Sequence, residues 1–151
     1  MSSDTAPWSL RTVCADDIDE DALIALYTAV GWANYTHDPE LLWRAIRGAH
    51  FLVIAEAVGS LIGLARTVSD DASIVYIQDI LVHPAHHRQG IGRGLVSAIL
   101  ARYPHVRQKV LLTDNRPEQI AFYAALGFQN TRDLTETPLN AFVRIEGATL
   151  N

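Results

Sequence analysis

The residues best suited to chemistry in this chain form a glycine-containing loop behind an apolar stretch. Gly90 and Gly92 are separated by one residue and follow Arg88 closely. Small residues let an incoming group approach the backbone, and the helix predicted to begin here offers unpaired N–H groups and a partial positive charge. The loop is therefore predicted to bind a phosphate or pyrophosphate. A plain strand–loop–helix turn is the simpler interpretation of the same glycines.

The spacing of these glycines differs from the common nucleotide-binding motifs. A third glycine, Gly94, comes one residue too early for the G-x-G-x-x-G pattern, and the loop lies in the middle of the chain. No G-x-x-x-x-G-K-[ST] sequence occurs anywhere. We therefore expect neither NAD nor ATP to be the ligand.

The elements that position this loop run in the order strand, two helices, three strands, helix, strand, helix, strand. Apolar periodicity and turn residues predict strands over 8–13, 51–57, 61–68, 74–82, 109–113 and 139–145. They predict helices that start at the capping residues Asp16 and Asp17 and run to Gly31, and that span 38–48, 90–102 and 117–126, with an irregular segment at 32–37. This order is typical of an α/β fold, with one domain over 1–151 and a mixed central sheet carrying helices on both faces.

Two short motifs make this pattern more specific. The first follows the apolar strand and reads Val82-His83-Pro84-Ala85-His86-His87-Arg88-Gln89-Gly90-Ile91-Gly92. The second lies further along the chain and reads Phe122-Tyr123-Ala124-Ala125-Leu126-Gly127-Phe128. Both resemble motifs of the GCN5-related N-acetyltransferases, which carry [Q/R]-x-x-G-x-[G/A] after a Val-x-Pro strand end and an aromatic–Tyr pair before x-x-x-Gly-Phe. The resemblance extends over most of the chain, and two motifs together are more specific than one.

The resemblance implies acetyl-CoA as the co-substrate. Backbone N–H groups from Arg88 to Arg93 would face its pyrophosphate. The pantetheine arm would pair with the strand edge that precedes the loop, which places the thioester carbonyl near backbone N–H donors. The implied cofactor-binding residues are Ile80, Leu81, Val82, His87, Arg88, Gln89, Gly90, Ile91, Gly92, Arg93 and Asn115.

Two positions depart from the family pattern. His87 stands at the [Q/R] position, and Arg88 is displaced from it by one residue. Asn115 precedes Tyr123 by eight residues, where seven is more usual in the family. Because family members bind pyrophosphate mainly through backbone amides, His87 is compatible with the same role.

Tyr123 is the residue that the resemblance implies as the general acid. The leaving group is a thiolate, which a phenol with a pKa of about 10 can protonate. The alternative is that Tyr123 belongs to the core together with Phe122 and Leu126, which are spaced for packing on one helix face.

The acceptor ammonium must also lose a proton, and Asp79 is one candidate base. It lies in an otherwise apolar predicted strand, where regular alternation places it on the same face as Ile77 and Leu81. A carboxylate there is either paired structurally or functional. Glu56, in another apolar strand, is a weaker candidate, and water is a third.

Aromatic and histidine residues complete the set of candidates. Trp32 and Tyr35 lie in the two-helix segment that borders the acceptor in the family, and we expect them to bind substrate; ordinary packing is the alternative. The histidines at 83, 86 and 87 lack a partner carboxylate or cysteine at metal-ligand spacing, so we expect no metal.

The bulk composition excludes several classes of partner. A formal net charge of -5 disfavours nucleic-acid binding, and no apolar run reaches the roughly 18–20 residues of a membrane span. Cys14 is the only cysteine, and the N-terminal residues lack the features of a signal peptide. We expect a cytoplasmic protein that acts on a small molecule, and we leave open whether it forms a homodimer.

The resulting functional expectation is an acetyl-CoA-dependent N-acetyltransferase. A primary amine of a small molecule, with an arylalkylamine as one candidate, would attack the thioester directly in a ternary complex. Two alternatives remain: acetylation of a protein N-terminus or lysine, and a module that senses acetyl-CoA without turnover.

Overall fold

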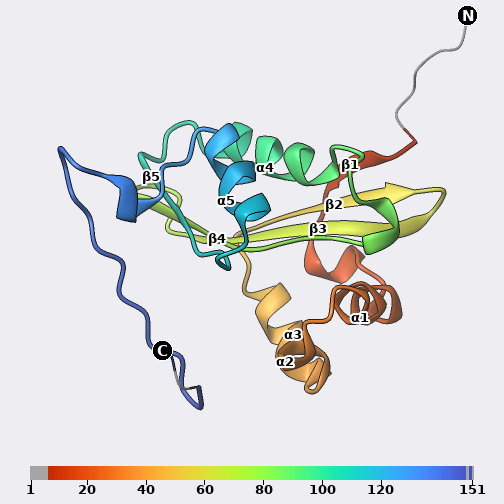
Figure 1. The fold of residues 1–151 in the computed structure, drawn as a ribbon. Helices are drawn as coiled ribbons and strands as arrows, with labels where there is room; N and C mark the ends of the chain where they lie inside the picture. The colour runs from red at the N-terminus through yellow and green to blue at the C-terminus, as the bar shows by residue number, and fades with distance from the viewer. Residues whose placement is uncertain (1–6, 149, 151) are drawn as a thin grey trace, which may run out of the picture. The chain divides into compact units, whose positions relative to one another are not determined.

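The computed structural model of the protein describes residues 7–148 and residue 150. The chain divides into two compact units, with the boundary between Leu112 and Thr113. Within the described residues, the first unit holds five strands and the helices α1 to α4, and the second unit holds α5 (Figure 1). No helix formed by these residues is long and apolar enough to cross a membrane.

A mixed sheet forms the centre of the first unit. Its strands are β1 (Ser9–Thr12), β2 (Phe51–Ala57), β3 (Ser60–Ser69), β4 (Ile74–Val82) and β5 (Gln108–Leu111). Neighbouring strands in the sheet follow the chain order, with antiparallel pairing from β1 to β4 and parallel pairing between β4 and β5. The predicted mixed sheet is confirmed, and its first five strands lie within one or two residues of their expected ends.

Helices cover both faces of this sheet, as predicted. Figure 1 shows α4 (Ile91–Arg102) on one face and α1 (Glu20–Ala29), α2 (Ala33–Thr36) and α3 (Pro39–Arg47) on the other. On the α1–α3 face, the buried cluster joins helix residues such as Leu23 and Ile46 to Leu52, Leu64 and Leu81 of the strands. On the opposite face, α4 buries the four apolar residues of its predicted stripe, namely Ile91, Leu95, Val96 and Ile99.

The start of α1 differs from the expectation. Asp16 and Asp17 lie in a single 3-10 turn, and the capping residue of α1 is Asp19, whose carboxylate accepts a hydrogen bond from the Ala22 N–H at 3.0 Å. Three aspartates in four positions can all serve as caps, so the sequence pattern alone selects the wrong one. The segment 32–37, expected to be irregular, contains the short helix α2.

The β3–β4 ladder carries a bulge that changes the orientation of one candidate residue. Arg66 pairs with Asp79, but Thr67 pairs with Ile77, so Gln78 is the extra residue in β4. The hydroxyl of Thr67 bonds to Tyr103, directly after α4, whereas Asp79 bonds to Tyr27 of α1. The expected placement of Asp79 on the face of Leu81 is confirmed, and its placement with Ile77 is wrong because the bulge interrupts the alternation.

The second unit contains α5 (Pro117–Ala125) and a 3-10 turn at Thr131–Asp133. The strand predicted over 139–145 is wrong, since this segment has no regular structure and exposes Leu139, Phe142, Val143 and Ile145. An alternating apolar pattern forms a strand only where another backbone pairs with it, and the structure shows no such ladder for this segment among the described residues.

Candidate functional site

The loop from His87 to Gly90 adopts an uncommon backbone conformation. Arg88 and Gly90 both have positive φ angles, 63° and 80°, and α4 begins directly after Gly90. Glycine takes this left-handed conformation readily, but a residue with a side chain does so rarely and usually where the surroundings enforce it. The side chains of His87, Arg88, Gln89 and Arg93 are exposed around this turn.

The backbone amides of this loop are free to bind a ligand. Among the described residues, no acceptor is found for the N–H groups of residues 88–93, whereas the Gly94 N–H bonds to the Gly90 carbonyl at 3.0 Å. These amides lie at the positive end of a twelve-residue helix. The arrangement suits an anion such as pyrophosphate. Ile91, expected among the cofactor residues, buries its side chain, so it can contribute only its backbone.

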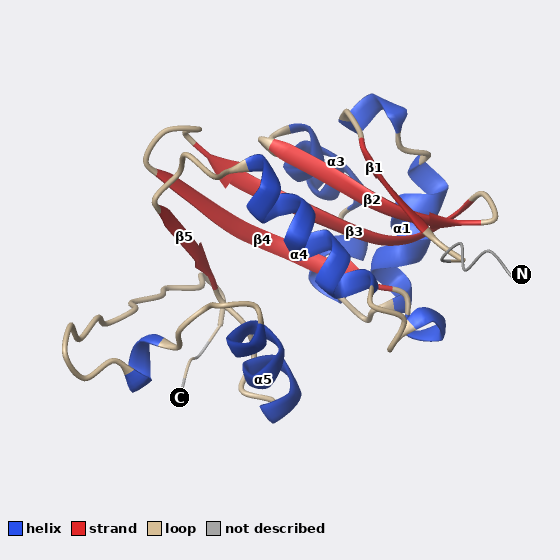
Figure 2. Cartoon of the chain, turned by 90° about the horizontal axis from the view of Figure 1, so that it is seen from above, coloured by secondary structure: helices blue, strands red, loops and turns tan. Residues whose placement is uncertain are grey.

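The strand before the loop has an open edge. Pairing between β4 and β5 ends at Ile77 and Leu111, and Figure 2 shows the two strands diverging from there. The edge of Ile80, Leu81 and Val82 that faces away from β3 therefore has no ladder partner among the described residues. An extended chain, such as the pantetheine arm, can hydrogen-bond to an edge of this kind.

Asp79 lies in a buried polar cluster beneath the bulge. One carboxylate oxygen accepts hydrogen bonds from Tyr27 Oη at 2.8 Å and from Arg66 Nε, and the other accepts from Tyr35 Oη at 3.3 Å. Arg66 also donates to Tyr35 Oη at 2.9 Å. Burial, and next the charge of Asp79, raise the pKa of the Tyr27 phenol, which keeps it protonated as a donor.

These contacts favour the structural interpretation of Asp79 over the catalytic one. Both oxygens of the carboxylate already accept hydrogen bonds, and Arg66 neutralises its charge. Glu56, the second candidate base, is paired with Arg11 at 2.9 Å across the β1–β2 edge. Each of the two candidate carboxylates is therefore already paired with an arginine.

The aromatic residues of the α1–α3 segment come together as a group. Tyr27, Trp32 and Tyr35 have ring centroids between 5.1 and 6.2 Å apart. Tyr35 and Trp32 are half-buried against the core, and the Tyr35 hydroxyl is also within 3.4 Å of Gln78 Nε2 in the bulge. Tyr35 thus links the helical segment to the part of β4 that leads to the open edge.

Tyr123 and Asn115 belong to the second unit. Tyr123 is half-buried on α5, with edge-on contacts to Phe122 and Phe128. Burial, and next the charge of Asp114, raise the pKa of its phenol. Asn115 is exposed, and its side-chain oxygen accepts a hydrogen bond from Arg132 at 3.2 Å. Because its pKa is raised, the Tyr123 phenol is protonated at neutral pH and can donate a proton, as a general acid must.

The histidines before the loop contribute to its local structure. His83 Nδ1 accepts a hydrogen bond from the Ala85 N–H at 3.0 Å, and the rings of His83 and His86 meet edge to face. Both line a hollow of about 460 Å³ beside α1 and the β2–β3 turn, which Trp32 and Tyr35 do not line. Within the described residues, no three His, Cys, Asp or Glu side chains are grouped to hold a metal ion.

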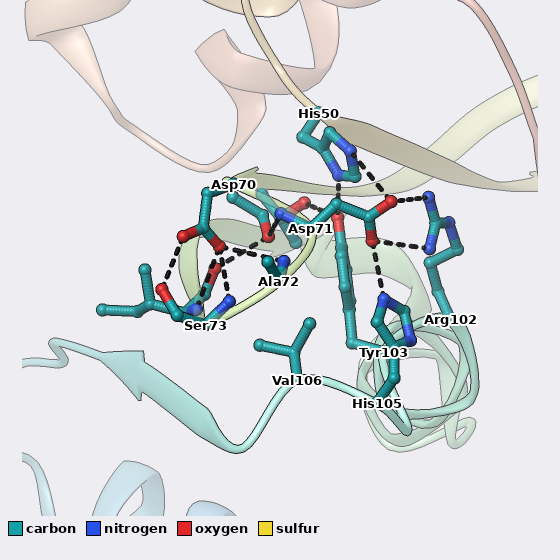
Figure 3. A network of polar contacts seen from close by, with 12 residues as sticks. His50, Asp70, Asp71, Ala72, Ser73, Arg102, Tyr103, His105 and Val106 are labelled. Atoms are coloured by element: carbon teal, nitrogen blue, oxygen red, sulfur yellow. Dashed lines mark hydrogen bonds and ion pairs between the residues drawn. The ribbon is translucent and has the colours of Figure 1, made fainter.

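A second polar network lies at the opposite end of β4 (Figure 3). The Asp71 carboxylate accepts hydrogen bonds from Arg102 at 3.2 Å and contacts His105 Nε2 at 2.8 Å, while His50 Nδ1 lies 2.6 Å from the Tyr103 hydroxyl. Asp71 itself has a positive φ of 57°. These contacts connect the β3–β4 turn to the end of α4, and we assign the network a structural role.

Several residues that contact the candidate site were not among the sequence candidates. Arg66 and Tyr27 complete the Asp79 cluster, and Trp8 hydrogen-bonds to the loop through Gln89. A buried carboxylate does signal that a cationic partner exists, but its position on a neighbouring strand depends on the register. No sequence pattern connects Trp8 to residue 89.

Comparison with known proteins places these features in context. A model of the acetyltransferase (GNAT) family matches residues 15–128. An acetyltransferase of the GNAT family from Streptococcus pneumoniae has a similar structure, with a TM-score of 0.75 and 27% sequence identity, covering 93% of this chain and 99% of that one.

Two curated proteins are also similar in sequence. A mycothiol acetyltransferase from Clavibacter michiganensis subsp. michiganensis is 31% identical over 106 residues, which is 70% of this chain and 34% of that protein. A histone acetyltransferase from Glycine max is 29% identical over 126 residues, covering 75% of this chain and 53% of that protein. The chain thus spans between a third and about half of the length of these relatives, whose names differ in the acceptor.

Proposed function

This chain belongs to the acetyltransferase (GNAT) family, and from that membership we propose that it transfers an acetyl group from acetyl-CoA to a primary amine of a small molecule. The observation that carries the proposal is the set of free amides over residues 88–93 at the start of α4, next to the open edge of β4. The free amides suit a pyrophosphate, and the open edge of β4 suits an extended pantetheine arm. A single domain over 1–151 and a cytoplasmic location belong to the same proposal.

The reaction is a direct transfer in a ternary complex. The amine nitrogen forms a bond to the thioester carbon, the carbon–sulfur bond breaks, and the sulfur leaves as a thiolate. In this proposal the Tyr123 phenol gives its proton to the thiolate, and backbone N–H groups near Ile80 stabilise the developing oxyanion. Asp79, with both oxygens engaged, positions the bulge. Water takes one proton from the acceptor ammonium before the attack, and the second proton, which the nitrogen loses as the amide forms, passes through water to the Tyr123 phenolate.

The acceptor we propose has an aromatic or apolar body, with an arylalkylamine as the first candidate. Trp32 and Tyr35 offer aromatic faces, which bind apolar rings and ammonium groups alike. On the same face of the sheet, Val68 is 52% exposed and pairs with Tyr76. Burial, and next the charge of Asp79, raise the pKa of Tyr76. The carboxylates at 56 and 79 are paired with arginines, so they give no reason to expect a polycationic acceptor.

A panel of acceptors tests this proposal through the release of free CoA thiol. We compare kcat/KM for arylalkylamines, polyamines, amino acids and lysine peptides, using the wild type, Trp32→Ala and the control Leu41→Ala, which removes an exposed apolar side chain of α3. The expected result is that arylalkylamines are the best acceptors and that Trp32→Ala raises the KM of the acceptor without changing that of acetyl-CoA. A tenfold preference for lysine peptides would favour a protein acetyltransferase, and binding of acetyl-CoA without thiol release would favour a sensing module.

A further inference from the structure

Trp8, which immediately precedes β1, contacts the loop of residues 88–93. Its indole N–H donates a hydrogen bond to the carbonyl oxygen of Gln89 at 3.0 Å. The indole ring also lies against the first turn of α4, at Gly94. We propose that Trp8 is a positioning residue that holds this loop in the conformation that binds the pyrophosphate of acetyl-CoA. The inference rests on the proposed function and extends it to a residue outside both sequence motifs.

The hydrogen bond to Gln89 sets the direction of the next amide. In a trans peptide unit the C=O and N–H bonds lie in one plane and point in opposite directions. The Gln89 carbonyl points toward Trp8, so the N–H of Gly90, in the same peptide unit, points away from the indole. This N–H has no acceptor among the described residues, which leaves it available to a ligand.

The neighbouring backbone is in a conformation that needs such a restraint. Arg88, one residue before Gln89, has a φ of 63°, and Gly90, one residue after it, has a φ of 80°. A left-handed conformation at a residue with a side chain persists only where the surrounding structure holds it. The Trp8 hydrogen bond is made at the residue that follows Arg88, where it can maintain this conformation.

The position of the indole also explains the third glycine of the loop sequence. A Cβ atom at Gly94 would lie 3.1 Å from Cη2 of Trp8 and 3.3 Å from Cδ1 of Leu10, which is closer than ordinary packing allows. Gly94 therefore makes room for the indole, and a ligand is not needed to account for it. An alanine at this position would push the ring away from the loop, although alanine is the better helix former.

Calorimetry with CoA and with pantetheine, which lacks the pyrophosphate, tests the role of Trp8. Trp8→Phe keeps a ring and removes the donor, so we expect the Kd for CoA to rise about three- to tenfold, as for the loss of one hydrogen bond. Pantetheine binding, and the KM of the acceptor, should not change. Trp43→Phe is the matched control, because the buried Trp43 indole N–H has no hydrogen-bond partner among the described residues.

A double-mutant cycle separates positioning from general destabilisation. Gly94→Ala should weaken CoA binding in the wild-type background and have a smaller effect in Trp8→Ala, where only the contact with Leu10 remains. Equal CoA affinity for the wild type and Trp8→Phe would overturn the inference. An equal loss of affinity for CoA and for pantetheine in Trp8→Phe would also overturn it. Failure of the wild type to bind CoA would instead overturn the proposed function.

Discussion

Arg66 and Asp79 are register partners on β3 and β4, and their side chains form an ion pair in which both are buried, with 7% and 3% of their surface exposed. The pair lies next to the bulge at Gln78 and under the phenols of Tyr27 and Tyr35. Because of this ion pair, the Asp79 carboxylate on the α1 face of the sheet is not free to act as a base. Loss of either charge would leave the other buried and unpaired beside the bulge.

Asp79→Asn should destabilise the protein by about 3–5 kcal/mol, because Arg66 is then left buried without its counter-charge. Urea unfolding measures this loss. The double variant Arg66→Met with Asp79→Leu should lose less free energy of unfolding than Asp79→Asn alone, since it contains no unpaired buried charge.

The pH profile of this double variant decides between the two roles of Asp79. We expect kcat/KM to keep its acid limb, because water and not Asp79 accepts the proton. Loss of that limb in a folded double variant would identify Asp79 as the base.

Tyr123→Phe should lower kcat by about 10²–10⁴-fold, the usual contribution of a general acid, and leave the affinity for CoA unchanged. Because burial raises the pKa of Tyr123, the phenol of the wild type should stay protonated at neutral pH and above. The ratio of kcat between the wild type and Tyr123→Phe should therefore stay constant from pH 6 to 9. Tyr103→Phe, which removes a phenol from the network of Figure 3, is the control. A change of less than twofold under chemistry-limited conditions would assign Tyr123 to the core.

Asp71 should make stability depend on pH in the acidic range. Hydrogen bonds from His105 and then Arg102 lower the pKa of Asp71, while the unfolded value is about 3.9. A lowered pKa gives stability that is complete above about pH 4 and is lost as the pH falls toward the native pKa. Asp71→Asn, which tolerates the positive φ, should therefore have a lower Tm than the wild type at pH 7, and the difference should shrink below pH 4.

Thermal unfolding at pH 7, 5 and 3 measures this effect. Asp16→Asn, in the exposed turn before α1, is the control and should change Tm little at any of these values. A Tm difference between Asp71→Asn and the wild type that stays constant down to pH 3 would show that the network of Figure 3 does not act through the charge of Asp71.

The sequence was sufficient to predict those elements of the fold whose signals lie within one stretch of chain. The β4–loop–α4 unit follows from an apolar strand, Pro84, Gly90 and an amphipathic stripe, all within one stretch of chain. The interpretation failed where structure depends on distant partners. The bulge at Gln78 arises from the register with β3, and the strand expected over 139–145 lacks a partner among the described residues.

The same limit applies to the site. Backbone amides at a helix N-terminus can be predicted from a glycine pattern, because the helix itself creates them. The contacts of Asp79 with Tyr27 and Arg66 join three separate elements, and Trp8 meets Gln89 only because β1 and α4 share one unit of the fold. Pairings of this kind require the tertiary structure.

Calorimetric titration with CoA tests the central claim, that the loop of residues 88–93 binds the cofactor. The wild type should bind CoA and show no heat with NAD or ATP at the same concentrations. Gly92→Val places a β-branched side chain where the pyrophosphate approaches the backbone, and it should weaken CoA binding sharply. Unchanged CoA affinity in a folded Gly92→Val variant would contradict the assignment of this loop as the pyrophosphate-binding site.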